Sequence, residues 1–169
     1  MSCTLSKSIK KSSGCTEFSF GGVDNILIGD YNLISGMTET TGGTVDAMDG
    51  VFFEYDSQEQ TANFTQELVK GTNTYFTQTV NLTLSALSDE EYTELETLAR
   101  MKKLTVLVKH KTGTWYGFGL KGTGLSVTAM TDDSGTAFGD GHTTIVTLSG
   151  PNLGRYQIVD SAVAEALIP

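Results

Sequence analysis

Residues 60–84 read QTANFTQELVKGTNTYFTQTVNLTL. Two segments of alternating apolar and polar residues are joined by a turn at 70–73, Lys-Gly-Thr-Asn. Period-two alternation rich in Thr, Phe and Val is typical of an antiparallel β-hairpin with one buried and one solvated face. Each arm would span about 35 Å, whereas a usual strand has about 5–6 residues. We therefore expect the hairpin to form a surface shared between subunits.

The solvated face of this hairpin is the candidate assembly surface. Its side chains are small and uncharged, apart from one acid. The predicted members are Thr61, Asn63, Thr65, Glu67, Thr77, Thr79, Asn81 and Thr83. Gln66 and Gln78 interrupt the apolar face, and Lys70 is a base at the tip. The sequence therefore leaves open which face of the hairpin forms the shared surface.

The composition fits a single β-rich domain. The chain has 169 residues, with 19 glycines and only 2 prolines, which suits one domain with many tight turns. We predict an extended N-terminal arm at 1–16 and a single domain at 17–169. The expected class is mostly β (α+β): an antiparallel β-sandwich or barrel with a long hairpin and one packed α-helix.

One helix is predicted at 89–101. Ser88 and Glu91 have the spacing of a capping box, in which each side chain bonds the other residue's backbone N–H. Acids fill the first turn and bases follow the last, which complements the helix dipole. The apolar stripe expected to lie on a sheet is Tyr92, Leu95, Leu98 and Ala99.

The remaining elements are predicted from apolar runs and turn residues. We expect strands at 23–28, 31–34, 51–55, 104–108, 115–120, 124–130, 143–148 and, as an edge strand, 155–159. The folded body should start at 18–20, and the sheet should end at 150–152. A long loop is expected at 35–50, and a short helix at 161–167.

The formal net charge of -9 argues against sequence-specific nucleic-acid binding, which needs Lys and Arg to displace counterions from phosphate. Residues 12–69 contain no Lys or Arg but ten acids. This asymmetry favours contacts between the acidic half of one copy and the basic half of another; the alternative is a solvated acidic surface. No run approaches the roughly 18 apolar residues of a membrane span, and residues 6–11 provide no apolar core of a signal peptide. We therefore expect synthesis in the cytoplasm and no membrane partner.

Two motifs resemble ligand sites but lack the necessary context. Residues 117–122 match G-x-G-x-x-G, but a turn and a strand follow instead of the helix that a dinucleotide site requires. Asp132, Asp133, Asp140 and His142 crowd one loop without the alternating acids and closing Glu of an EF-hand. Such residues more often serve turn chemistry. We predict no metal, no cofactor and no catalytic residues.

Three aromatic residues support an alternative function. Trp115, Tyr116 and Phe118 lie in a glycine-rich hairpin and have the chemistry of a sugar-stacking platform. Aromatic residues in such a hairpin more often pack a core or an interface. A soluble β-sandwich module that binds a glycan or a protein is therefore the alternative function.

Several segments resemble virion structural proteins of tailed phages that infect Bacteroides-like hosts, including crAss-like phages. They are Gly-x-Gly-Leu-x-Val at 122–127, SGTAFGDG at 134–141 and TIVTLSG at 144–150. The opening is also similar: a polar arm containing cysteine, then Gly21-Gly22-Val23 leading into Ile26-Leu27-Ile28. These fragments cover about a third of the chain.

The resemblance implies a subunit of a phage tail or head–tail connector. In tail-tube and tail-terminator-type proteins, hexameric rings line a DNA channel with a hairpin from each subunit. It implies a homo-oligomeric ring with neighbouring tail or connector proteins, located in the virion, through which DNA passes transiently. The arm at 1–16 and the loop at 35–50 would engage neighbouring rings.

Overall fold

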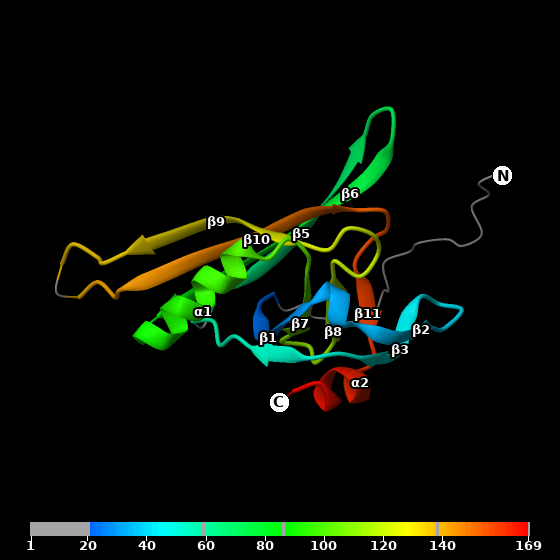
Figure 1. Ribbon diagram of the computed structural model, residues 1–169, viewed down its shortest axis with the longest axis horizontal. Helices are drawn as coiled ribbons and strands as arrows, with labels where there is room; N and C mark the ends of the chain where they lie inside the picture. Colours follow the sequence, from blue (N-terminus) through cyan, green and yellow to red (C-terminus); the bar gives the residue numbers. More distant parts are fainter. Residues whose placement is uncertain (1–20, 59, 86, 138, 169) are drawn as a thin grey trace, which may run out of the picture.

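The computed structural model describes residues 21–58, 60–85, 87–137 and 139–168. The strands are β1 (Val23–Asp30), β2 (Ser35–Glu39), β3 (Thr44–Asp49), β4 (Phe52–Glu54), β5 (Asn63–Lys70), β6 (Thr74–Ser85), β7 (Leu104–His110), β8 (Trp115–Phe118), β9 (Ser126–Asp133), β10 (Thr143–Asn152) and β11 (Gln157–Val159). The helices are α1 (Asp89–Arg100) and α2 (Ser161–Ala166). A seven-stranded sheet has the order β2-β3-β11-β8-β7-β1-β4, and a four-stranded sheet the order β5-β6-β10-β9 (Figure 1). The predicted mostly-β sandwich with a packed helix is confirmed.

One apolar core fills the space between the sheets and α1. The seven-stranded sheet contributes Ile26 and Val106, and the four-stranded sheet contributes Val80 and Leu82, all fully buried. Leu95 of α1 packs into the same cluster. Alternate residues of β6 therefore point inward, as the period-two pattern predicted.

A second core covers the other face of the seven-stranded sheet. Leu107 of β7 and Trp115 of β8 are fully buried there, together with Ala164 of α2. Both faces of β7 are thus covered. For that reason every residue from Leu104 to Val108 is buried, instead of every second one, and Thr105 is the one polar residue among them.

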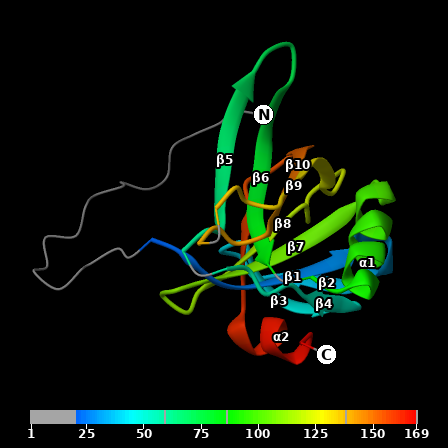
Figure 2. The ribbon, with the colours of Figure 1, turned by 90° about the vertical axis from the view of Figure 1, so that its left-hand side faces the viewer.

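The long hairpin predicted at 60–84 is present as β5 and β6. The two strands pair in register from Asn63 opposite Asn81 to Lys70 opposite Thr74. The tip rises well above the rest of the molecule in Figure 2. A second ribbon, formed by β9 and β10, extends in another direction beside α1 (Figure 1).

Helix α1 begins and ends close to the predicted residues. The backbone N–H of Ser88 donates to Glu91 Oε2 over 2.6 Å, and the Glu91 N–H donates to Ser88 Oγ over 3.4 Å. The predicted capping box is therefore confirmed. Leu95 and Leu98 are buried but Ala99 is exposed, so the apolar stripe is narrower than predicted.

Two predictions between residues 31 and 50 are wrong. The expected loop at 35–50 contains β2 and β3, which pair with each other despite two shifts in register. The buried residues of β3, Val45 and Met48, are three positions apart, so the strand shows no period-two pattern. The expected strand at 31–34 is a 3-10 helix over Tyr31–Leu33, because the Asp30 carboxylate accepts the N–H of Asn32 over 2.8 Å and turns the chain.

The C-terminal part also differs from two predictions. The strand expected at an edge is β11, which lies inside the sheet, antiparallel to β8 and parallel to β3. The strand expected at 143–148 is longer, since β10 continues to Asn152 opposite Phe76 and ends within the range 150–152 where the sheet was expected to end. The helix expected at 161–167 is confirmed as α2. The arm predicted at 1–16 and the start of the body at 18–20 lie outside the described residues.

Candidate assembly surface

The outward face of the four-stranded sheet holds seven of the eight predicted assembly residues. They are Asn63, Thr65 and Glu67 on β5, and Thr77, Thr79, Asn81 and Thr83 on β6. On β6 they alternate with buried residues such as Val80 and Leu82. Thr61 is not part of this face: it lies in the turn before β5, where its hydroxyl donates to the Gln58 carbonyl over 2.7 Å.

Strands β9 and β10 extend this face with residues that sequence reasoning missed. Thr147 lies opposite Asn81, and Ser149 lies opposite Thr79. Residues directly opposite each other in an antiparallel pair lie on the same face. The alternation in 143–152 could have suggested a polar face, but only the tertiary pairing of β10 with β6 joins the two segments.

Polar side chains on this face bond one another across the strands. The Asn81 amide Nδ2 donates to Asn63 Oδ1 over 2.8 Å, and the Thr147 hydroxyl donates to Asn81 Oδ1 over 2.8 Å. The hydroxyls of Thr79 and Ser149 lie 3.0 Å apart. These bonds link three strands through uncharged groups, which holds the surface side chains in place without charge.

The few charges on this face are negative. On β9, the residues opposite the outward side chains of β10 are Ser126, Ala129, Thr131 and Asp133. Asp133 and Glu67 are thus the charged residues in the outward rows of the described strands, and these rows contain no Lys or Arg; Lys70 at the hairpin end has the parity of the inner row. The surface therefore carries no cluster of bases with which to hold a nucleic acid.

Both edges of the four-stranded sheet are unpaired. β5 and β9 are the terminal strands, each with 8 residues, and no strand in the described part of the chain pairs with their outer sides. β9 has one register shift, next to Thr147 on its partner. An edge strand presents a row of free N–H and C=O groups to which another strand can bind.

The hairpin tip presents apolar side chains beyond the body. Leu68 lies opposite Phe76, and Val69 lies opposite Tyr75. Leu68 is 47% exposed, although its position in the alternation belongs to the inner face. Lys70 closes the last pair of the ladder, opposite Thr74.

The two glutamines that interrupt the apolar face form a buried polar network between the sheets. Gln78 is 2% exposed, and its Nε2 donates to Gln66 Oε1 over 3.3 Å and to the Gly154 carbonyl over 3.1 Å. Its Oε1 accepts the Gly119 N–H over 2.9 Å, while Gln66 Oε1 accepts the Tyr156 N–H over 2.6 Å. The glutamines therefore belong to the inner face, where they attach the hairpin to the loops after β8 and β10.

A polar cluster lies where the ends of β9 and β10 meet α1. Asp132 Oδ1 accepts the Thr144 hydroxyl over 2.7 Å and the Tyr92 hydroxyl over 3.2 Å, and lies 2.9 Å from His142 Nε2. The hydrogen bond from Thr144, and then that from His142, lowers the pKa of Asp132. The cluster thus fastens the β9–β10 ribbon to α1.

The carboxylates of Asp140 and Asp133 accept backbone N–H groups in the turn between β9 and β10. The Asp140 carboxylate accepts the N–H groups of Ala137 and Thr136 over 2.8 and 3.0 Å, and these bonds lower its pKa. Asp133 accepts the Gly135 N–H over 2.9 Å. The described residues contain no group of three or more His, Cys, Asp or Glu side chains placed to hold a metal ion.

The alternative sugar platform is wrong because its aromatic residues do not face solvent together. Trp115 and Phe118 are completely buried, and the half-buried Tyr116 packs against Phe64 with ring centroids 5.4 Å apart. The glycine motif at 117–122 leaves β8 and leads to β9 without a helix, as the sequence indicated.

The chain matches no protein-family model, and a search of curated proteins also gives no match. Within the described residues, neither helix has the length and apolar character needed to cross a membrane.

Proposed function

We propose that this protein is a structural subunit of a phage tail or head–tail connector, and that its copies join into a ring around the DNA channel. The observation that carries the proposal is the four-stranded sheet: it has two free edges of equal length and an outward face that is almost uncharged. The resemblance of residues 122–150 to phage virion proteins supports the same assignment.

The two edges support a ring that is closed by strand pairing. If β5 of one copy pairs with β9 of the next, the sheet continues from subunit to subunit and the free backbone groups of both edges are bonded. Such a head-to-tail contact is heterologous, and it generates a ring when the rotation closes. The hairpin tip, with its exposed Leu68, then projects beyond the body towards a neighbouring ring.

The chemistry of the outward face suits a channel for DNA. Threonine, serine and asparagine hydroxyls and amides are already bonded to one another. Glu67 and Asp133 repel phosphate, and the strands supply no cluster of bases for counterion release. DNA in contact with this face would slide without being held. The candidate lumen residues are Asn63, Thr65, Glu67, Thr77, Thr79, Asn81 and Thr83.

Sedimentation velocity over a concentration series, with electron microscopy of the assembled fraction, tests the proposal. We expect rings in the wild type and their loss in Ala129→Lys, which places a charge on the β9 edge. Ala47→Lys is the matched control, since Ala47 is also an exposed strand alanine but lies in the other sheet. A protein that stays monomeric at every concentration, even with its cognate structural partners, would contradict the proposal.

A further inference from the structure

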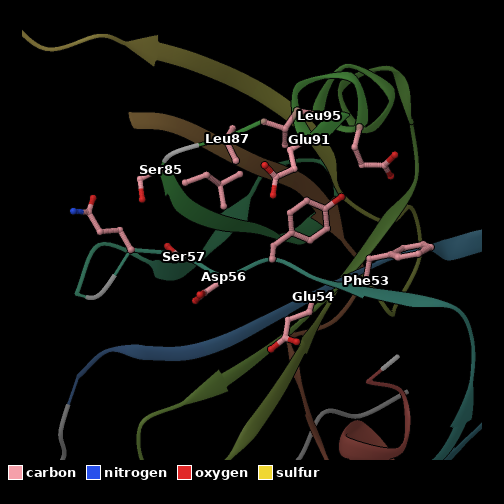
Figure 3. A pocket seen from close by; sticks show the side chains of 12 residues that line it. Phe53, Glu54, Asp56, Ser57, Ser85, Leu87, Glu91 and Leu95 are labelled. Carbon is pink, nitrogen blue, oxygen red and sulfur yellow. The ribbon is translucent and has the colours of Figure 1, made fainter. Parts of the chain in front are cut away.

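A groove of about 760 Å³ lies between α1 and the segment that follows β4. Its side chains surround an open space in Figure 3. Apolar groups line much of it: Tyr55, Leu84, Leu87 and Leu95. Phe53 at its rim is 54% exposed, which is unusual for so large an apolar side chain. The groove therefore offers apolar surface to a ligand.

The charged groups along the groove are all acidic. Glu54 and Asp56 come from the β4 side, and Glu91 and Glu94 come from α1. In the described part of the chain, none of these four carboxylates forms a salt bridge. Burial raises the pKa of Tyr55 to about 12, and the charge of Glu94 adds to the rise. A ligand for this groove should therefore combine positive charge with apolar side chains.

The chain itself contains a segment of that composition ahead of β1. Residues 5–11 read Leu-Ser-Lys-Ser-Ile-Lys-Lys, with three lysines and two aliphatic residues. No other Lys or Arg follows until Lys70. The segment belongs to residues 1–20, which the structure does not describe.

The described chain also begins beside the groove. Asn25 Nδ2 donates to Glu54 Oε1 over 2.6 Å, and the Tyr55 N–H donates to the Ile26 carbonyl over 2.9 Å. The nine residues between Lys11 and Gly21 correspond to ten Cα–Cα steps, which can span up to about 33 Å, so the segment can reach the groove of its own molecule. A short tether also gives an effective concentration in the range of about 1 mM.

We propose that this groove binds residues 5–11 of the same chain. Lys7, Lys10 and Lys11 would pair with the four carboxylates, while Leu5 and Ile9 would cover the apolar floor. The inference does not depend on the proposed function, because groove and segment belong to one molecule. The same segment from a second copy is a competing occupant that the experiment separates.

Cross-linking in the full-length protein tests this inference, because the only two cysteines, Cys3 and Cys15, lie in the N-terminal segment. In a Cys3→Ser background, Gln58→Cys places a thiol at the groove, where Gln58 is exposed. Thr112→Cys is the matched control. It lies in an exposed turn beside Lys111, whose N–H donates to the Gly22 carbonyl over 3.2 Å, so it is also near the start of the described chain but has basic neighbours.

We expect the intramolecular link from Cys15 to form at least about fivefold more in Gln58→Cys than in Thr112→Cys, as several weak exposed ion pairs would favour. Peptide mapping by mass spectrometry measures it. Adding Asp56→Lys with Glu94→Lys should reduce the yield to the control level. Replacing lysines 7, 10 and 11 by Glu should do the same while leaving the groove unchanged. Salt at about 1 M should also reduce it, because the Debye length falls to about 3 Å.

Equal yields at the two positions, or a yield that charge reversal and salt leave unchanged, would overturn the inference. A link that forms mainly between two molecules would overturn it as well, and would instead favour an arm that binds a neighbouring subunit. Circular dichroism of each variant confirms that the comparison is made between folded proteins.

Discussion

The buried glutamine network gives the sharpest prediction about stability, through the substitution Gln78→Leu. Leucine has a similar volume but no amide, so the Gly119 N–H loses its acceptor and the Gly154 carbonyl loses its donor. Gly119 is buried between the sheets, where water does not readily replace the lost partner. The substitution removes one partner of each hydrogen bond and leaves the other partner unsatisfied, which costs more free energy than removing both partners.

The magnitude follows from the number of groups left without partners. A buried donor or acceptor without a partner costs about 1–3 kcal/mol. With Gly119 fully buried and Gly154 partly buried, we expect the free energy of unfolding to fall by about 2–4 kcal/mol. For a urea m-value of about 2 kcal/mol/M, the midpoint should fall by about 1–2 M.

Gln78→Glu keeps the shape of the side chain, and its effect on the free energy of unfolding should depend on pH. An ionised carboxylate still accepts the Gly119 N–H but places its second oxygen against two acceptors, the Gly154 carbonyl and Gln66 Oε1. The pKa of this glutamate in the folded state should therefore be raised above its unfolded value of about 4.3. A raised pKa means that, relative to wild type, the variant is most stable below about pH 4 and loses stability as the pH rises through the folded pKa.

Urea unfolding followed by the fluorescence of Trp115 measures these effects, since this residue is the only tryptophan and is completely buried. Gln58→Leu is the control, because Gln58 is exposed and should change stability by less than about 0.5 kcal/mol. A midpoint for Gln78→Leu equal to that of the control would refute the reasoning. So would a Gln78→Glu variant whose stability relative to wild type does not change between pH 4 and pH 7.

Three further predictions concern the core and two titrating groups. Leu82→Ala should cost about 2–5 kcal/mol in urea unfolding because Leu82 is fully buried, whereas Leu153→Ala, at a position 79% exposed, should cost less than about 0.5 kcal/mol. The lowered pKa of Asp132 means that the stability it contributes is present above its unfolded pKa and is lost as the pH falls through the folded pKa; the protection of amides near Tyr92, which is the exchange rate relative to the intrinsic rate at the same pH, should therefore fall in acid, and unchanged protection would contradict this. Tyr55, with its pKa raised to about 12, should stay protonated at about pH 11 in a spectrophotometric titration while ordinary tyrosines ionise near 10, and stability should fall as the pH rises from about 10 through the folded value.

The elements that the sequence predicted are those that depend on residues close together in the chain. The hairpin of β5 and β6 follows from strict alternation, and α1 follows from the spacing of Ser88 and Glu91, which bond within one turn. In both cases, residues within a few positions of one another determine the element. The outward position of Thr79 and Asn81 could be predicted for the same reason.

The elements that the sequence did not predict depend on distant partners. β11 is three residues long and lies inside the sheet only because β3 and β8 pair on its two sides. The two glutamines appeared to interrupt an apolar face because their partners, Gly119, Gly154 and Tyr156, come from loops elsewhere in the chain. The acidic groove likewise forms only when α1 packs beside the segment after β4.

The position of the glutamine network connects stability with the proposed assembly. Gln66 and Gln78 form a register pair, and the pair of Leu68 and Phe76 follows it towards the tip, where Leu68 is already half-exposed. The network therefore lies where the hairpin leaves the body, and it fixes the direction of the free tip and of the β5 edge. A substitution that loosens this point, such as Gln66→Ala, removes the acceptor of the Tyr156 N–H without touching the outward face. If rings form through the β5 edge, assembly should weaken in this variant under conditions where circular dichroism still reports a folded protein, because pairing of an edge strand requires a fixed orientation.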